Sequence, residues 1–173
     1  MTAPHLDQAK LHALLHYDAA DSGVFTWLPR ASARWNTRYA GRVAGYDWKI
    51  GNQTYRCIRI FDWPFLGHRL AFLYITGNWP ALGVDHRDGN GLNNRWANLR
   101  EATKQQNAAN TGIPRTNTSG FKGVSPCKNG KWRATIRIDG RQRWLGRFDT
   151  KEAAYTAYCR AAADRHGEFE RTA

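Results

Sequence analysis

Residues 84–107 of this sequence, VDHRDGNGLNNRWANLREATKQQN, combine side chains suited to acid–base and metal chemistry. An Asp-His pair is followed by five asparagines, and these seven residues are Asp85, His86, Asn90, Asn93, Asn94, Asn98 and Asn107. A neutral histidine, with an ordinary pKa near ~6.5, is a suitable general base at neutral pH. Carboxylate and amide oxygens suit Mg²⁺ or Mn²⁺ better than Zn²⁺. Such a cation stabilises charge on a leaving alkoxide, so the set suits hydrolysis of a phosphodiester.

Local patterns predict the elements that would position these side chains. GVDH (83–86) is typical of a short strand, residues 87–94 of a loop, and WANLR (96–100) of a second strand. Thr103 and Gln106 form a capping box that predicts the start of a helix. The result is a strand–loop–strand–helix (ββα) unit.

A ββα unit would bring Asp85 and His86, at the end of its first strand, beside Asn107 in its helix. The residues alone also permit a simpler interpretation. In it Asp85 caps a turn, His86 is an ordinary surface histidine, and the asparagines form turns.

GHRLAFLYITGNWP (67–80) and residues 84–107 together resemble the core of the HNH endonuclease family, in its phage and intron-homing variant. The shared order is Asp-His, a Gly- and Asn-rich loop, Asn-Leu, and a helix that carries Asn. The resemblance implies four roles: His86 as general base, Asn98 as the residue that holds the loop and orients the histidine, and Asp85 and Asn107 as ligands of one Mg²⁺ or Mn²⁺. Asn107 stands where the name-giving pattern often has histidine, and Asn110 is an alternative. The implied products carry a 5′-phosphate and a 3′-hydroxyl.

Further basic residues near this core are candidates for phosphate contacts: His68, Arg69, Arg87, Arg95 and Arg100. His68 and Arg69 match a His-Arg pair that precedes the core in the family, although a buried structural role fits them equally. For the three other arginines the alternative is a solvated surface.

The composition favours a polyanionic partner. The 173 residues carry a formal charge of +12, which produces a field that attracts nucleic acid. An anionic membrane surface is the alternative, but no basic amphipathic helix dominates, no apolar run reaches the ~18 residues of a membrane span, and the N-terminus lacks a signal peptide. Three scattered cysteines predict neither a zinc site nor a disulfide framework. We therefore expect a cytoplasmic protein without a small-molecule substrate, and the resemblance to phage and homing enzymes implies a phage or prokaryotic host cell.

Pro, Gly, Thr and Asn in the segment 110–118 predict a linker between an N-terminal region (1–109, with the HNH core at about 60–109) and a C-terminal domain (119–173). In the N-terminal region, periodicity predicts a helix over Leu6–His16, strands at 22–28 and 54–61, and a helix over 67–77. Residues 30–52, which are rich in arginine and aromatic side chains, are expected to be irregular.

The C-terminal domain has the pattern of three strands and one helix. The strands are expected at 121–126, 131–138 and 141–148, with Asp139-Gly140 as a hairpin turn. The helix is expected to begin with a capping box of Asp149 and Glu152 and to end at Gly167. A regular hairpin pairs Thr135 with Trp144 and Arg133 with Gly146. One face of the sheet would then carry Arg133, Thr135, Arg137, Gln142 and Trp144, which suits a DNA groove. The alternative is a solvated sheet with one stray tryptophan.

Residues 117–170 resemble the Apetala-2/ethylene-response-factor (AP2/ERF) DNA-binding domain, through FKGV, KWRATIR, WLGRFDT and EAAYTAY. That family inserts a three-stranded sheet into the DNA major groove. The positions that match its contact residues are Lys122, Lys131, Thr135, Arg137, Gln142, Trp144 and Arg147. Ser125 and Cys127 replace basic residues of the plant pattern, so the target sequence does not transfer.

The combined prediction is an α+β protein with an N-terminal ββα-metal HNH core and a C-terminal three-stranded antiparallel sheet packed on one helix. It would be a mobile-element type, metal-dependent endonuclease for double-stranded DNA, acting as a monomer or a homodimer and nicking one strand or cutting both. Two alternatives remain: a DNA-binding regulator with an inactive core, and an RNA-binding protein with an aromatic, basic surface.

Overall fold

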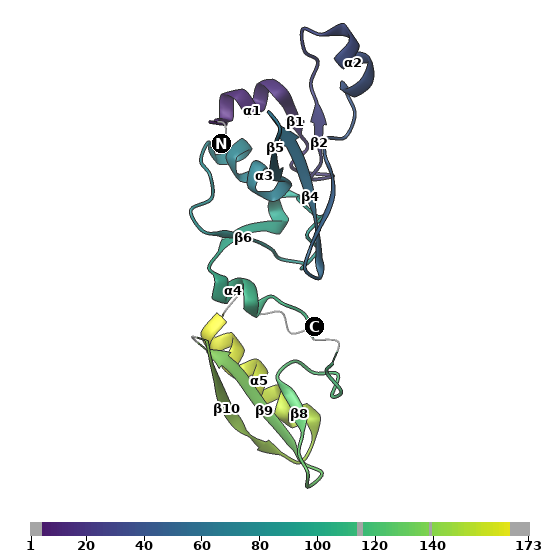
Figure 1. The fold of residues 1–173 in the computed structure, drawn as a ribbon. Coiled ribbons are helices and arrows are strands. Elements are labelled where there is room, and N and C mark those ends of the chain that lie inside the picture. Colours follow the sequence, from purple (N-terminus) through teal and green to yellow (C-terminus); the bar gives the residue numbers. More distant parts are fainter. Residues whose placement is uncertain (1–4, 114–115, 139, 167–173) are drawn as a thin grey trace. The chain divides into compact units, whose positions relative to one another are not determined.

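The computed structural model describes residues 5–113, 116–138 and 140–166 (Figure 1). The chain forms two compact units, residues 1–101 and 102–173. Helix α4 (Lys104–Ala109) falls in the second unit, whereas composition predicts a boundary after it. Within that unit the ammonium group of Lys122 donates to the carbonyl oxygen of Ala109, which ties the end of α4 to the segment before the C-terminal sheet.

The N-terminal unit contains three small sheets around a central helix. In chain order its elements are α1 (Gln8–Leu14), β1 (Leu15–Tyr17), β2 (Phe25–Trp27), α2 (Ala33–Tyr39), β3 (Tyr46–Ile50), β4 (Gln53–Ile60), β5 (Trp63–Leu66), α3 (Gly67–Thr76), β6 (Gly83–His86), a 3₁₀ turn (Trp96–Asn98) and β7 (Leu99–Ala102). Strand β1 pairs with β2, β4 lies between β3 and β5, and β6 pairs with β7.

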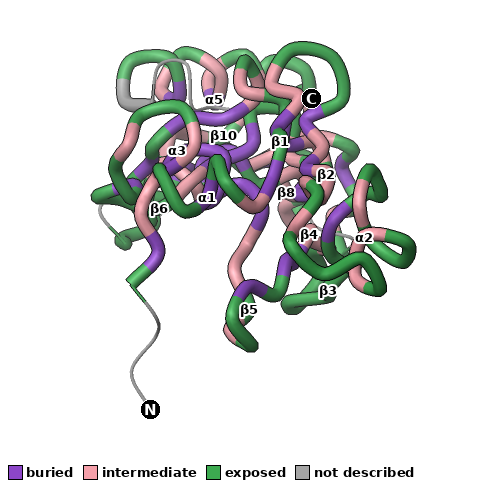
Figure 2. Tube along the Cα trace, turned by 90° about the horizontal axis from the view of Figure 1, so that it is seen from above, coloured by how far each residue is buried: buried purple, intermediate pink, exposed green. Residues whose placement is uncertain are grey.

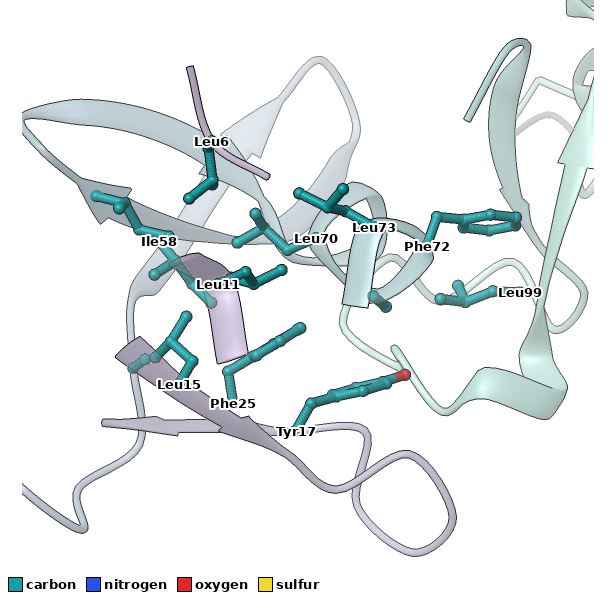
Figure 3. Packing of buried hydrophobic residues seen from close by; sticks show 13 residues of the cluster. Leu6, Leu11, Leu15, Tyr17, Phe25, Ile58, Leu70, Phe72, Leu73 and Leu99 are labelled. Atoms are coloured by element: carbon teal, nitrogen blue, oxygen red, sulfur yellow. The ribbon is translucent and has the colours of Figure 1, made fainter. Parts of the chain in front are cut away.

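The core of this unit is built around α3 (Figure 3). Leu70 of α3 is fully buried, as are Leu11 and Leu15 from the N-terminal segment and Ile58 from β4. Fully burying one such side chain contributes on the order of 1.5–3 kcal/mol. This packing fixes α3 against β4 and so fixes the base on which the HNH segment rests. By contrast with these buried residues, all five residues of β3 are exposed (Figure 2).

Several predicted elements of the N-terminal unit need correction. The first helix ends at Leu14, because Leu15 and Tyr17 both turn into the core from strand β1 with the alternation of an extended chain. The expectation that residues 30–52 are irregular is wrong: they contain α2, which the Ser32 side chain caps, and β3, which pairs with β4. Strand β5 was not predicted.

The ββα prediction around the HNH segment differs in one detail. Strand β6 has the predicted bounds, and the capping box of Thr103 and Gln106 at the start of α4 is confirmed. The second strand begins later than expected, at Leu99, because residues 96–98 form a 3₁₀ turn that closes the loop.

The C-terminal unit contains a three-stranded antiparallel sheet with a helix along one face (Figure 1). The strands are β8 (Val124–Pro126), β9 (Trp132–Ile138) and β10 (Arg141–Phe148), and β9 is central. Helix α5 (Lys151–His166) buries Ala154, Tyr158 and Ala162. These residues pack against Ala134 and Ile136, so the apolar face of β9 is the one that the helix covers.

The register of the β9–β10 hairpin corrects one predicted pair. Ile138 pairs with Arg141 and Thr135 with Trp144 as expected, but Gly146 pairs with Ala134 rather than Arg133. A bulge at this point adds one residue to β10, and Gly146 adopts a φ of 139°, which favours glycine. Arg147 therefore pairs with Arg133.

The predicted ends of α5 also change. The side chain of Thr150, and not of Asp149, accepts a hydrogen bond at the start of the helix, from the amide of Ala153 at 3.1 Å. The expected turn residue Asp139 and helix stop Gly167 lie outside the described residues. Among the described helices none is long and apolar enough to cross a membrane.

Candidate active site

Asp85 and His86 lie at the end of β6, and both side chains are buried. The Asp85 carboxylate accepts from Arg100 of β7: its Oδ2 lies 2.9 Å from Nε and 2.8 Å from Nη2. Both side chains of this ion pair are only 7% exposed. A buried carboxylate is costly without compensation, so Arg100 explains how Asp85 is tolerated next to the imidazole.

The imidazole of His86 is held by Asn94, from the far end of the loop. His86 Nε2 lies 3.0 Å from Asn94 Oδ1, and Asn94 is 2% exposed. The hydroxyl of Tyr17 donates to the Asn94 carbonyl oxygen. A Cβ atom at position 67 would lie 2.9 Å from Asn94 Nδ2, so glycine at the start of α3 makes room for this side chain.

This contact sets the protonation of the ring. An amide oxygen only accepts, so His86 Nε2 carries the hydrogen and the basic lone pair is on Nδ1. Burial lowers the pKa of His86 below its ordinary value, although the hydrogen bond to Asn94 and the charge of Asp88 act to raise it. The imidazole is therefore neutral at neutral pH, which is the form that can accept a proton.

The loop between β6 and the 3₁₀ turn is organised by Asn98. Its Nδ2 donates to Asp88 Oδ1 at 3.0 Å and to the Asn93 carbonyl at 2.7 Å, and its Oδ1 accepts from the Asp88 amide at 3.1 Å. Asn93 also donates to Asp88 at 2.6 Å. Asn98 thus closes the loop at its base, whereas the hydrogen bond to the imidazole comes from Asn94.

The ring of His68, from α3, and the ring of Tyr55, from β4, lie beside His86. The ring of His68 lies 5.1 Å from that of His86 in an edge arrangement, and the ring of Tyr55 lies 6.0 Å from it. His68 is buried, and its Nδ1 has no hydrogen-bond partner among the residues that the structure describes. Burial, with smaller effects of His86 and Arg69, lowers the pKa of His68 to about 3. His68 is therefore a neutral packing partner, as in the structural alternative, rather than a cation for phosphate.

The comparison with known proteins decides the family. Residues 66–109 match the HNH endonuclease family. Protein 3.8 of Escherichia phage T7 is 39% identical over 89 residues, which are 51% of this chain and 73% of that protein. This chain belongs to the HNH endonuclease family. An uncharacterized HNH endonuclease, L560, of Acanthamoeba polyphaga mimivirus is 32% identical over 128 residues, or 73% of this chain and 66% of that protein. No solved structure gives a significant match.

The sequence-based assignment of the HNH endonuclease domain is thereby confirmed, while the catalytic role of each residue stays a prediction. Asn107 lies in α4, in the second unit, so its expected place beside Asp85 also stays a prediction. Within the described ranges, no group of three or more His, Cys, Asp or Glu side chains gathers as a metal site. In the first unit the predicted metal ligand is Asp85, whose carboxylate is a hard oxygen donor of the kind that Mg²⁺ and Mn²⁺ accept.

The other basic residues near the HNH site divide by exposure. Arg87 and Arg95 are exposed, and the Arg95 guanidinium donates to the Asp21 carbonyl oxygen. Arg69 is half-buried, with its guanidinium 5.9 Å from the ring centre of Trp79. Arg100 is buried against Asp85, a placement that suits the ion pair and not a phosphate on the surface.

In the C-terminal unit most of the residues predicted to bind DNA lie on the sheet face away from α5. Those that are exposed are Arg133, Arg137, Gln142, Trp144 and Arg147. Trp144 is 66% exposed, which is unusual for so large an apolar ring. Thr135 is half-buried and accepts from Gln142 at 3.1 Å. Two lysines have other partners: Lys122 donates to Ala109, and Lys131 forms an ion pair of 2.8 Å with Asp149.

Sequence reasoning missed two residues of the site. Asn94 is one asparagine among five in a loop, and nothing in its spacing distinguishes the one that binds the imidazole. Tyr55 lies 31 positions before His86 on β4, so only the fold brings the two rings together.

Proposed function

We propose that this HNH protein is a metal-dependent endonuclease that hydrolyses phosphodiester bonds in double-stranded DNA. The observation that carries the proposal is a neutral, buried His86, oriented by Asn94 and adjacent in the chain to Asp85. The net charge of +12 supports a polyanionic substrate.

In the proposed reaction the Nδ1 atom of His86 accepts a proton from the attacking water. The hydrogen bond from Nε2 to Asn94 holds the ring in one orientation and stabilises the imidazolium that forms. Arg100 fixes the carboxylate of Asp85 in one position. A divalent cation, Mg²⁺ or Mn²⁺, with Asp85 as a ligand and Asn107 as the expected second ligand, would stabilise negative charge on the leaving oxygen.

We further propose that residues 119–173 form an AP2/ERF-type domain that binds DNA through its exposed sheet face. The face combines arginines, which recognise guanine edges and phosphates, with an exposed tryptophan that can pack on sugars. The bulge in β10 supports this role, because it adds Arg147 to the same face as Arg133. A tethered DNA-binding domain raises the effective concentration of substrate at the HNH site.

The test is conversion of supercoiled plasmid with Mg²⁺ or Mn²⁺, with wild type beside His86→Ala. The proposal expects nicked or linear DNA from wild type only. If neither protein cuts but both retard duplex DNA, the chain is a DNA-binding protein with an inactive core. If both cut equally, His86 is not the base and the mechanism is wrong.

A further inference from the structure

The positive charge of the N-terminal unit is concentrated in one segment, residues 28–59, which we call the basic arm. The arm holds seven basic residues and one acidic residue, while the other residues up to position 101 hold five basic and seven acidic ones. The single acid, Asp47, is neutralised by Arg56 at 2.8 Å. The unit therefore owes its whole positive excess to the arm.

The basic arm also exposes an aromatic strip. Tyr46, Trp48 and Ile50 alternate along β3 and so share one face, and each is more than 40% exposed. Neither HNH chemistry nor the core accounts for them, because β3 is an edge strand whose five residues are all exposed. Apolar side chains at this exposure, grouped rather than scattered, mark a binding surface.

This strip continues into the candidate active site. Trp48 pairs directly with Tyr55 across the β3–β4 hairpin, so their side chains project from the same face. The ring of Tyr55 lies 5.4 Å from His68 and 6.0 Å from His86. Arg59, four residues further along β4, projects from the same face and is exposed as well. A path of aromatic and basic side chains therefore leads from the exposed edge of the sheet to the imidazole.

Helix α2 adds further cations to the arm. Arg34 and Arg38 are exposed on a helix with no acidic residue in its first turn. The guanidinium of Arg30 lies 4.0 Å from the ring centre of Trp35 and 5.0 Å from that of Trp27. This stacking holds the base of α2 in place.

We propose that the basic arm binds duplex DNA beside the scissile bond, with Tyr46 and Trp48 of the strip packed on sugars and bases and Arg34, Arg38 and Arg59 on phosphates. The proposal rests on the proposed function and names the surface by which the HNH site holds its own substrate. DNA is favoured over an acidic protein because the strip ends at a site for phosphodiester hydrolysis.

The experiment measures affinity for a labelled duplex by fluorescence anisotropy, with the full chain carrying His86→Ala so that nothing is cut. Trp48→Ala should weaken binding about tenfold, because the variant loses the apolar contact of a large ring with the duplex. Phe61→Ala is the matched control, because Phe61 is equally apolar, 54% exposed and lies at the β4–β5 turn outside the arm. It should bind within twofold of the parent.

A second readout separates charge from stacking. The double variant Arg34→Ala/Arg38→Ala should reduce the slope of log affinity against log salt by about 2, at roughly 0.9 per phosphate contact. Lys10→Ala, at an exposed position of α1, is the control and should leave the slope unchanged. The same measurements are repeated in a chain that also carries Arg137→Ala and Trp144→Ala, so that binding by the C-terminal sheet does not mask binding by the arm.

If Trp48→Ala and the double variant bind as the controls do, the arm does not bind duplex DNA and the inference fails. Because binding is measured without cleavage, this failure is distinct from failure of the plasmid assay. If the arm binds DNA but the wild-type protein never cuts plasmid, the proposed binding surface stands and only the proposed nuclease activity is refuted.

Discussion

The imidazole Nε2 of His86 and the amide Oδ1 of Asn94 are 3.0 Å apart inside the protein, although the two residues are eight positions apart in the chain. Asn94 is in turn positioned by the Tyr17 hydroxyl from β1 and by the space that Gly67 leaves at the start of α3. The orientation of the candidate base therefore depends on contacts from three elements, and not on the local geometry of β6.

Replacement of Asn94 tests this dependence. Asn94→Leu removes the acceptor and frees the ring to rotate, so kcat for DNA cleavage should fall about 10–100-fold while KM stays within a few-fold, in the range typical of a group that orients a catalytic residue. Asn94→Asp keeps an acceptor oxygen and should retain most of kcat. The measurement is steady-state plasmid cleavage beside thermal unfolding. Equal kcat in wild type and Asn94→Leu would show that the orientation comes from elsewhere.

The buried pair of Asp85 and Arg100 predicts a stability effect. Arg100→Met removes the guanidinium from a carboxylate that is 7% exposed, and should lower the free energy of unfolding by about 3–5 kcal/mol. Adding Asp85→Asn should restore part of the lost stability, because position 85 then carries no buried charge that needs the guanidinium. Urea unfolding at pH 7.5 measures both, with Arg87→Met at an exposed site as control. A loss below about 1 kcal/mol for Arg100→Met would argue against a buried ion pair.

His68 makes stability depend on pH. Its pKa is about 3 in the folded protein and near ~6.5 in the unfolded chain, so between these values only the unfolded state binds the proton. Stability contributed by neutral His68 is present above pH ~6.5 and is lost as pH falls, by about 2 kcal/mol at pH 5. His86, whose pKa is also lowered, acts in the same direction.

Urea unfolding of wild type and His68→Phe at pH 7.5 and pH 5.0 isolates this contribution. The free energy of unfolding should differ between the two pH values by about 2 kcal/mol less in the variant than in wild type, whatever the absolute stability of the variant. His16→Gln, at an exposed position, should not change it. An unchanged pH dependence in His68→Phe would mean that His68 is protonated or exposed in the folded protein.

The exposed face of the C-terminal sheet predicts a loss of affinity without loss of fold. Arg137→Ala and Trp144→Ala should each weaken duplex binding, by about 1–3 kcal/mol where a contact to a base is lost. Thermal unfolding should not change, since both side chains are exposed. Arg160→Ala on the exposed side of α5 is the matched charge control. Unchanged affinity in both variants would refute the groove-binding face.

Elements that depend on signals between residues close in the sequence were predicted correctly. The capping box of Thr103 and Gln106 marks the start of α4, and β6 and β10 have the predicted bounds. Strand β3 was missed although Tyr46, Trp48 and Ile50 alternate with polar residues, because its segment was interpreted from its composition alone. Pairing with β4 is what makes this short, fully exposed segment a strand. Helix α1 was predicted too long because Leu15 satisfies the helical and the extended pattern equally, and tertiary packing decides between them.

At the site, residue types and order were sufficient to find Asp85 and His86, but not their partners. Arg100 was expected to contact phosphate because an arginine near a nuclease motif suggests one, and burial cannot be inferred from its type. The pairing of Arg147 with Arg133 required the bulge, which depends on the φ of a single glycine, Gly146.

Gly91 lies where the Gly- and Asn-rich loop packs against β4. A Cβ atom at this position would be 2.5 Å from the Thr54 carbonyl oxygen and 2.8 Å from the ring of Tyr55, the same ring that lies beside His86. Gly91→Ala must therefore push the loop off β4 or displace Tyr55. We expect a loss of about 1–3 kcal/mol in the free energy of unfolding and a fall in cleavage rate. Gly112→Ala, where a Cβ meets nothing within 4 Å, is the control for the change in backbone entropy alone and should be close to neutral. If Gly91→Ala cuts and unfolds like Gly112→Ala, the loop does not press on Tyr55, and the path from the basic arm to His86 through that ring loses its support.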